Sequence, residues 1–463
     1  MRRPMCLLGC VLFPLACVWA SRGPAHENIA PARQSPSSAK FQFQGAGSCA
    51  AQSCHNADGL AGFQGREYRI AFERDFSQER PRALDKHAQA YAILFDERSQ
   101  RIMRNWKGIA SNLPVHPEFE DRCLRCHVHP EFDQLTSHVV NGVEQFRRED
   151  GVSCETCHGP AERWLATHFR PGWRESSASQ RLALGMNDTR SVLGRVRLCL
   201  PCHIGSPGAD IDHDLIAAGH PWLKFEIGDY HSRWHKHWDS AKDKNPSADP
   251  RGRPDFEARL WIIGQIASAQ TALHVLEARA SDVNRPWPEF AEIDCFACHQ
   301  DLQAAKPRVT RGAKAGAPTW NAWYTATLPR ALAMPQLRHR NASWNSPRQQ
   351  TAMEAREAIL DLQTLLMPWE SQDADIAPVD ALTRNLLTQP GQQSADSCIE
   401  AAQWQQALAA FQRARVDLRL PSAPWSAQLS RLEQLLRWPL GFDSPRSYDP
   451  TAVREVMKEM APR

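Results

Sequence analysis

The sequence has almost no excess charge of either sign. It contains 55 Lys and Arg residues against 52 Asp and Glu, which gives a formal net charge of +3 at pH 7. Nucleic-acid-binding proteins usually carry a concentrated basic patch, so we expect no nucleic-acid partner. No nucleotide-binding loop, nucleophile or paired general acid and base stands out either, so the sequence lends no support to chemistry that depends on them.

Long apolar runs are also missing after the N-terminal segment, so we expect the body of the chain to lie outside the membrane. The first 20 residues are typical of a secretory signal. Arg2 and Arg3 form its positive end, and the apolar stretch from Met5 to Ala16 is too short to span a bilayer comfortably. We expect cleavage after Ala20 and a flexible tether over 21–40. The alternative is an uncleaved anchor, which would be the chain's one means of membrane association.

Cysteine is too sparse for a disulfide-rich scaffold, but it recurs in a regular pattern. Four C-x-x-C-H motifs and one stretched C-x4-C-H motif account for ten of the 14 cysteines. The motifs are formed by Cys49, Cys54 and His55; Cys123, Cys126 and His127; Cys154, Cys157 and His158; Cys199, Cys202 and His203; and Cys295, Cys298 and His299.

The spacing within these motifs is that of c-type haem attachment. Two thiols add to the two vinyl groups of haem as thioethers, and the histidine that follows binds the iron. We therefore expect five covalently attached haem c groups, the one at Cys49 and Cys54 depending on a longer loop closing over the same vinyl pair. Zinc sites would use C-x-x-C pairs two at a time and need no histidine after each pair. A thioredoxin-like redox pair would need a βαβ context, and none is visible.

The thirteen histidines outside the motifs could supply second iron ligands. A second histidine closes the iron to substrates and lowers its potential, whereas a missing one leaves the iron open. Any one of these histidines could instead be an ordinary hydrogen-bonded residue. The candidates for second ligands are His87, His168, His213, His220 and His274, with His116, His129 and His138 in reserve.

Local patterns support these candidates. His213 and His220 bracket two helical turns that Gly219 should end. His87 begins a predicted helix that runs to about Trp106, and His274 lies on a predicted amphipathic helix over 254–280. In a further cluster, His231 and His235 fall on one predicted helical face, which could bind a haem or another metal ion. With His237, we expect them instead to form a polar rim near haem propionates.

The pieces from Gly45 to His220 resemble the multihaem cytochromes related to the tetrahaem cytochrome c-554, and more distantly hydroxylamine oxidoreductase. The most specific piece is Gly151-Val152-Ser153-Cys154-Glu155-Thr156-Cys157-His158-Gly159-Pro160. The resemblance implies that His87 and His168 bind haems other than their sequence neighbours, and that haems stack in nearly touching pairs. It also implies that the haem on His127 can lack a second ligand.

The chain also departs from that family. Its first motif is stretched, the motif at Cys295–His299 is extra, and the segment after Trp320 has no counterpart in the tetrahaem protein. No lysine replaces a motif histidine, so the resemblance to pentahaem nitrite reductases is poor. Only Tyr324 and Tyr448 follow the last motif, and neither is marked for a cross-link to haem as in hydroxylamine oxidoreductase.

We predict a mainly α protein whose loop-rich multihaem cytochrome c domain, with a haem-filled core, spans 41–304. A linker over 305–319 and a helical C-terminal domain over 320–463 should follow. Helical periodicity in the latter covers 347–369, 380–388, 394–418 and 425–436. These helices could pack against the last haem, dock a partner, hold a dimer together or form a structural cap. We expect Cys398 to be a buried or free thiol.

The leading hypothesis is a periplasmic pentahaem cytochrome c, exported in a Gram-negative type bacterium, that transfers electrons between redox partner proteins. The alternative is a haem-dependent oxidoreductase that acts on a small nitrogen or sulfur compound at one open haem. The sequence leaves open which proteins are donor and acceptor, and the oligomeric state.

Overall fold

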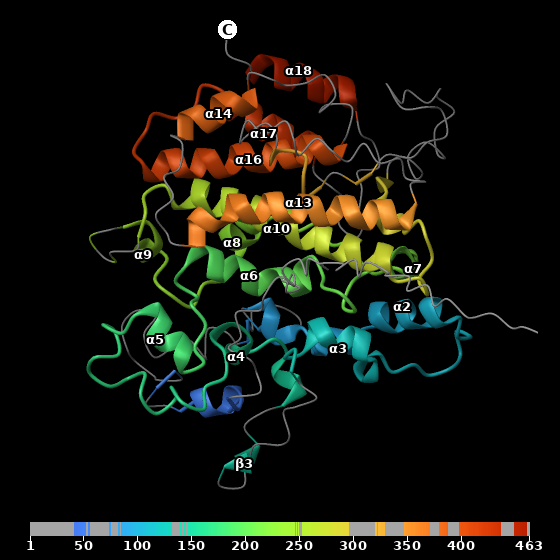
Figure 1. Ribbon diagram of the computed structural model, residues 1–463, viewed down its shortest axis with the longest axis vertical. Helices are drawn as coiled ribbons and strands as arrows, with labels where there is room; N and C mark the ends of the chain where they lie inside the picture. The colour runs from blue at the N-terminus through green and yellow to red at the C-terminus, as the bar shows by residue number, and fades with distance from the viewer. Residues whose placement is uncertain are drawn as a thin grey trace, which may run out of the picture. The chain divides into compact units, whose positions relative to one another are not determined.

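The computed structural model is mainly helical, which confirms the predicted fold class (Figure 1). The residues that it describes are 41–51, 54–55, 74–75, 82–83, 85–131, 139–140, 143–144, 147–245, 247, 249, 252–295, 320–321, 323–328, 347–370, 379–387, 398–436 and 449–460. The predicted signal, tether and linker lie outside these residues. No described helix is long and apolar enough to cross a membrane.

Short helices dominate the first half of the chain. The α-helices are α2 (Glu97–Lys107), α3 (Asp121–His127), α4 (Cys154–His158), α5 (Ala178–Ala183), α6 (Val192–His203), α7 (His213–Ala218), α8 (Ile227–Arg233) and α9 (Ala241–Lys244). The 3-10 helices are η2 (Ala46–Cys49), η3 (Lys86–Gln89), η4 (Ala92–Phe95), η5 (Pro117–Phe119), η6 (Arg148–Asp150) and η7 (Phe290–Glu292). Two antiparallel pairs, β1 (Arg74–Asp75) with β2 (Arg82–Ala83) and β3 (Val139–Val140) with β4 (Val143–Glu144), complete this part.

One predicted helix is wrong in its extent. The segment from His87 to Trp106 divides into η3, η4 and α2, and α2 begins only at Glu97. The physical reason is Asp96, whose extended backbone (ψ 151°) ends η4 and caps α2. The prediction for α7 is confirmed, because Gly219 ends that helix in the left-handed conformation with φ 116°.

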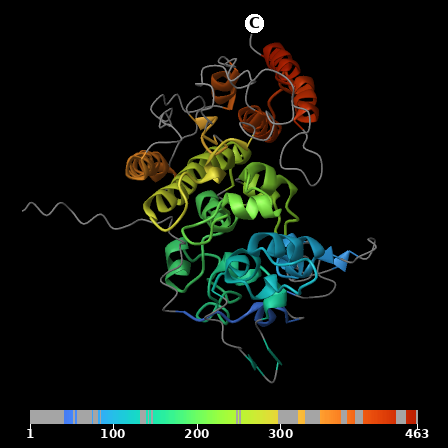
Figure 2. The same ribbon diagram turned by 90° about the vertical axis from the view of Figure 1, so that its right-hand side faces the viewer.

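The centre of the described core is α10 (Phe256–Ser281), which is buried along nearly all of its length. It was predicted to be amphipathic, and that is wrong because helices cover it on both sides. Helices α6 and α8 contact it on one side, while α13 (Arg348–Glu370) and α16 (Cys398–Asp417) contact it as well. In both views the elements that carry the first four cysteine motifs lie on one side of α10, and α16 lies on the other (Figures 1 and 2).

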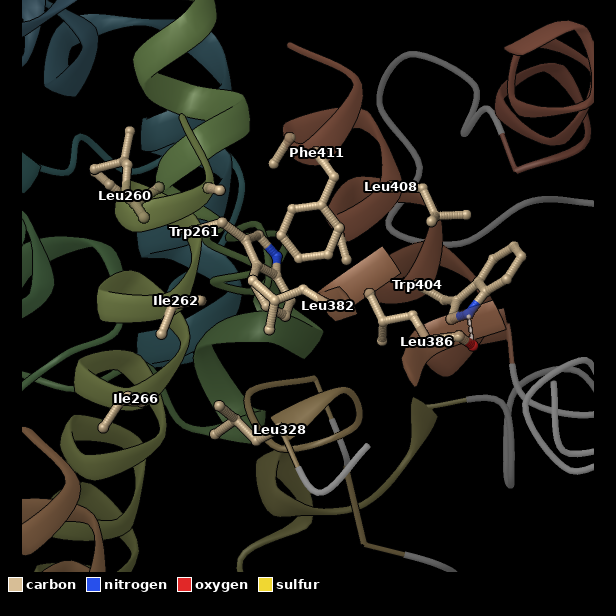
Figure 3. Close-up of a cluster of buried hydrophobic side chains, with 14 of the residues drawn as sticks. Leu260, Trp261, Ile262, Ile266, Leu328, Leu382, Leu386, Trp404, Leu408 and Phe411 are labelled. Atoms are coloured by element: carbon tan, nitrogen blue, oxygen red, sulfur yellow. Dashed lines mark hydrogen bonds between the residues drawn. The ribbon is translucent and has the colours of Figure 1, made fainter. Parts of the chain in front are cut away.

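The C-terminal helices agree with the predicted periodicity. They are α13, α14 (Val379–Leu387), α16, α17 (Ser426–Leu435) and α18 (Pro450–Met460), the last of which was not predicted. Trp261 of α10 packs against Phe411 of α16 with ring centroids 5.0 Å apart (Figure 3). Helices from both sides of the predicted linker thus share one hydrophobic core, and the division into two domains stays a prediction.

Candidate haem-binding sites

Three of the cysteine motifs lie on helices that end at the motif histidine. Helix α3 ends at His127, α4 at His158 and α6 at His203. Residues three and four apart lie on one face of a helix, so the two sulfurs and the imidazole of each motif point to the same side. The stretched motif begins at the end of η2, and its His55 lies in a turn. Of the fifth motif, Cys295 is described, whereas Cys298 and His299 lie outside the described residues.

Three motif histidines each face a histidine from elsewhere in the chain. The ring centroids are 5.9 Å apart for His55 and His168, with planes at 10°. They are 6.0 Å apart for His203 and His87, with planes at 89°. They are 6.2 Å apart for His158 and His237, with planes at 69°.

This separation is the one that a shared metal ion would require. Each nitrogen that binds a metal lies about 2 Å from it and about 1 Å from its own ring centre, so two opposed imidazoles have centroids about 6 Å apart. Each of the three pairs therefore has the separation that two histidines would need in order to hold one haem iron. Each pair joins segments far apart in the sequence, as the resemblance implied for His87 and His168.

Hydrogen bonds at Nδ1 set the tautomer of several of these rings. Nδ1 of His87 lies 2.9 Å from Asp85 Oδ1, Nδ1 of His168 lies 2.8 Å from the Leu165 carbonyl, and Nδ1 of His127 lies 2.7 Å from the Ala90 carbonyl. These oxygens only accept, so Nδ1 carries the proton and donates. Nε2 then keeps the lone pair that binds a metal.

Burial favours the neutral form of the motif histidines. It lowers the pKa of His203 to about 4, with a further contribution from the charge of His87. It also lowers the pKa of His127. At neutral pH both imidazoles are uncharged, which is the form that binds iron. Burial acts to lower the pKa of His87 as well, but Asp85 outweighs it and the pKa lies above its usual value.

The attachment sulfurs of different motifs are neighbours. Cys49 forms a side-chain hydrogen bond with Cys154. Burial and the nearby Cys199 and Cys202 raise the pKa of Cys157 to about 12. The Sγ atom of Cys202 lies 4.0 Å from the Arg125 carbonyl inside the second motif. The motifs therefore adjoin in the order His55, His158, His203, His127.

A glycine of the most specific family segment lets His87 approach the third motif. Gly151 has φ 61°, and a Cβ there would lie 2.6 Å from the His87 carbonyl oxygen. The next residue, Val152, donates its N–H to that carbonyl at 3.0 Å. A side chain at position 151 would push apart the segment that contains His87 and the segment that leads into the third motif.

Apolar side chains around these histidines are exposed to an unusual degree. Phe169, which contacts His168, is 70% exposed, and Phe119, which contacts His116, is 67% exposed. Ile93 and Phe95 of η4 are also exposed. A porphyrin bound beside these histidines would cover such side chains. The opposed histidines and the three helices that end at a motif histidine fit haem.

The remaining predicted ligands have other neighbours. His213 packs on Phe290 with centroids 5.7 Å apart, His220 donates from Nδ1 to the Pro221 carbonyl at 2.8 Å, and His274 lies 3.9 Å from Glu277. Among the reserves, His116 is bonded to Glu118 at 3.0 Å and His138 lies outside the described residues. His129 is buried and accepts the Glu131 N–H at Nδ1, so its Nε2 carries the proton.

The histidine cluster at 231–237 differs from the prediction. Helix α8 ends at Arg233, so His231 and His235 do not share a helical face. His231 is buried and bonded to Arg195 at 3.0 Å, and His235 is exposed. His237 lies opposite His158 instead. Sequence reasoning missed this pairing, and the only available signal was the number of ligands still required.

A zinc site has no support in the described part of the chain, where no three side chains of His, Cys, Asp or Glu converge to hold a metal ion.

The comparisons with known proteins point to haem. Residues 77–159 match the family model described as cytochrome c554 and c-prime. That segment includes His87, the second and third motifs and Gly151. Comparison with curated proteins and with solved structures gave no match. The family match indicates a c-type cytochrome with covalently bound haem c that takes part in electron transfer.

Proposed function

We propose, from the resemblance of this chain to the cytochrome c-554 family, that it is an exported pentahaem cytochrome that carries electrons between redox partner proteins in the periplasm. Bound haem supplies one-electron redox chemistry at its iron. The observation that carries the proposal is that His55, His158 and His203 each face a histidine from outside the motifs.

The chain's own residues hold and orient the cofactors. His168, His237 and His87 supply the second iron ligand for the first, third and fourth motifs. Two strong ligands keep substrates away from the iron and lower its potential, which suits an electron carrier. The adjoining sulfurs from Cys49 to Cys202 hold the attachment points close together, and short separations favour transfer from one haem to the next.

The fifth haem, at Cys295, Cys298 and His299, is part of the proposal. Cys295 packs with Trp222 and Trp323 and with Ile399 of α16. We assign its second ligand to the remaining candidates, His213, His220 and His274. Of these three, His213 is bonded to the segment that leads into the fifth motif: its backbone N–H donates to the Glu289 side chain at 3.0 Å.

A second function is favoured by His127. Within the described residues no second imidazole faces its ring, although its Nδ1 is fixed by the Ala90 carbonyl like that of an ordinary ligand. The haem on His127 would then be open to a small nitrogen or sulfur compound, and the other haems would conduct electrons to or from it. The resemblance to the tetrahaem family favours the same haem.

The test uses the full chain, produced with its haems by a host that performs c-type maturation. We expect the intact mass to show five haems per chain. Electron paramagnetic resonance should show low-spin haems, with one high-spin iron that nitric oxide converts. Four haems or fewer would overturn the pentahaem assignment. Five low-spin haems that do not respond to nitric oxide would overturn the second function and leave an electron carrier.

A further inference from the structure

Asp85 is a buried carboxylate that holds His87. It is 7% exposed and accepts three hydrogen bonds. Its Oδ1 accepts from the His87 backbone N–H at 3.0 Å and from the His87 Nδ1 at 2.9 Å. Its Oδ2 accepts from the Trp234 indole at 3.1 Å. The ring of His87 is thereby fixed in the orientation that faces His203.

The Nδ1 partner of His87 differs from those of His168 and His127. His168 and His127 donate to neutral backbone carbonyls, whereas His87 donates to a full negative charge. In the described part of the chain no Lys or Arg pairs with Asp85. The side chain that faces its charge is the imidazole of His87. A carboxylate at Nδ1 draws the proton away from the ring and makes Nε2 a stronger electron donor to a metal.

We propose that Asp85 is a positioning residue that lowers the reduction potential of the haem held between His203 and His87. The inference rests on the proposed function, because it requires His87 to bind iron. The sign follows from charge: oxidised iron carries one more positive charge than reduced iron, so a nearby negative charge and a more basic ligand both stabilise the oxidised form. At the matching haem between His55 and His168, the second ligand His168 donates from Nδ1 to the Leu165 carbonyl instead.

The haem between His203 and His87 lies in the middle of the series of motifs. Its attachment sulfurs adjoin Cys157 of the third motif and Arg125 of the second. The haem whose potential Asp85 lowers therefore lies inside the series, between the haems on His158 and His127. Asp85 thus sets a step in the middle of the electron path.

The ring angles allow this haem to be recognised by electron paramagnetic resonance. The planes of His203 and His87 are at 89°, whereas those of His55 and His168 are at 10°. Perpendicular ligand planes leave the two iron orbitals that share the unpaired electron nearly equal in energy, which gives a near-axial signal with a large maximal g value. Near-parallel planes split these orbitals and give a rhombic signal. The planes of His158 and His237 are at 69°, so that haem should have a maximal g value between the other two.

The experiment is a potentiometric titration of the haem-loaded full chain, with each haem followed by its resonance signal. In Asp85→Asn the amide oxygen can still accept from His87, but the charge is gone, so the midpoint of the near-axial signal should rise most. The haem on His158 should rise less, because the charge of Asp85 also acts on Cys157, and the remaining midpoints should stay. Asp85→Glu should restore a low midpoint. An unchanged midpoint in Asp85→Asn, or an equal rise of all midpoints, would overturn the proposal.

Two matched variants separate charge from structure. Trp234→Phe removes the indole donor but keeps the carboxylate, so the midpoint should not rise; a rise equal to that in Asp85→Asn would overturn the proposal. Glu118→Gln removes a carboxylate that bonds His116 at 3.0 Å and should leave the near-axial signal unchanged. His87→Ala tests the premise. If that variant shows no more high-spin haem than the wild type, the ligand assignment in the proposed function fails, whereas a new high-spin haem with no effect of Asp85→Asn refutes only the role of Asp85.

Discussion

The carboxylate of Glu155, inside the third motif, accepts the backbone N–H of Gly45 at 2.7 Å. It also accepts the N–H groups of Gln44 at 2.9 Å and of Ala161 at 2.7 Å. The side chain is 3% exposed, and burial raises its pKa against the opposing effect of these donors. Glu155 thereby ties the segment before Cys49 to the third motif, which explains how two motifs distant in sequence share a Cys49–Cys154 contact.

Replacing Glu155 by Ala should weaken the attachment of the first motif. The change leaves buried N–H groups without acceptors, at about 1–3 kcal/mol each, so we expect the unfolding free energy to fall by about 3 kcal/mol. The haem-to-chain ratio should fall by up to one. Denaturant unfolding and intact mass measure both. Glu162→Gln is the control, because Glu162 accepts an exposed N–H, that of Gln42, and no other from the described residues. Unchanged stability in Glu155→Ala would show that the clamp is dispensable.

Replacing His237 by Ala should convert the haem on His158 from low-spin to high-spin. His237 is the imidazole that faces His158 at 6.2 Å, and Ala offers no ligand. Resonance spectroscopy of the oxidised protein measures the change. The control is His235→Ala. His235 lies two residues away and is exposed, so its replacement should leave the spectrum unchanged. If both variants keep the wild-type spectrum, His237 is not a ligand.

Replacing Arg279 by Met should destabilise the protein by roughly 3–5 kcal/mol, because the buried Glu292 loses its partner and the buried Asp210 loses one of two, Arg285 being the other. Arg279 is 6% exposed and bonds Asp210 and Glu292, each at 2.8 Å. The matched control is Arg356→Met, which breaks an exposed ion pair with Glu277 and should cost at most about 1 kcal/mol. Thermal unfolding of both variants gives the comparison, and equal losses would contradict the expectation.

Stability should depend on pH through Glu226. Burial raises its pKa from 4.5 to about 7, against the opposing N–H groups of Gly228 and Asp229. Between these two values the folded protein holds a proton that the unfolded chain has released, so this group makes stability fall as pH rises from about 4.5 to about 7. The fall amounts to roughly 3 kcal/mol.

The measurement compares wild type with Glu226→Gln across that range by denaturant unfolding. The variant cannot ionise at this position, so its stability relative to wild type should improve as the pH rises. A constant difference between the two proteins would mean that Glu226 titrates normally.

Helices with a strong local signal could be predicted from the sequence. Periodicity gave α13, α14, α16 and α17 to within a few residues at most ends, because apolar spacing and chain-local capping depend on near neighbours. The prediction was less accurate where tertiary contacts decide. It made α10 amphipathic although helices cover it on both sides, and it extended a helix through Asp96 and another through Arg233.

The sequence by itself determined the haem-attachment chemistry. Two thiols that bond one porphyrin, and the histidine that binds its iron, must be close together in the chain. It also indicated His87 and His168 through their family context. Only the tertiary structure decided that His237, and not His231 or His235, lies opposite His158. It also decided that the carboxylate of Asp85 lies beside one proposed ligand, His87, and that no imidazole among the described residues faces His127. The reason is physical: attachment needs neighbours in sequence, whereas the second ligand and its partner come from whichever segment folding brings within about 6 Å.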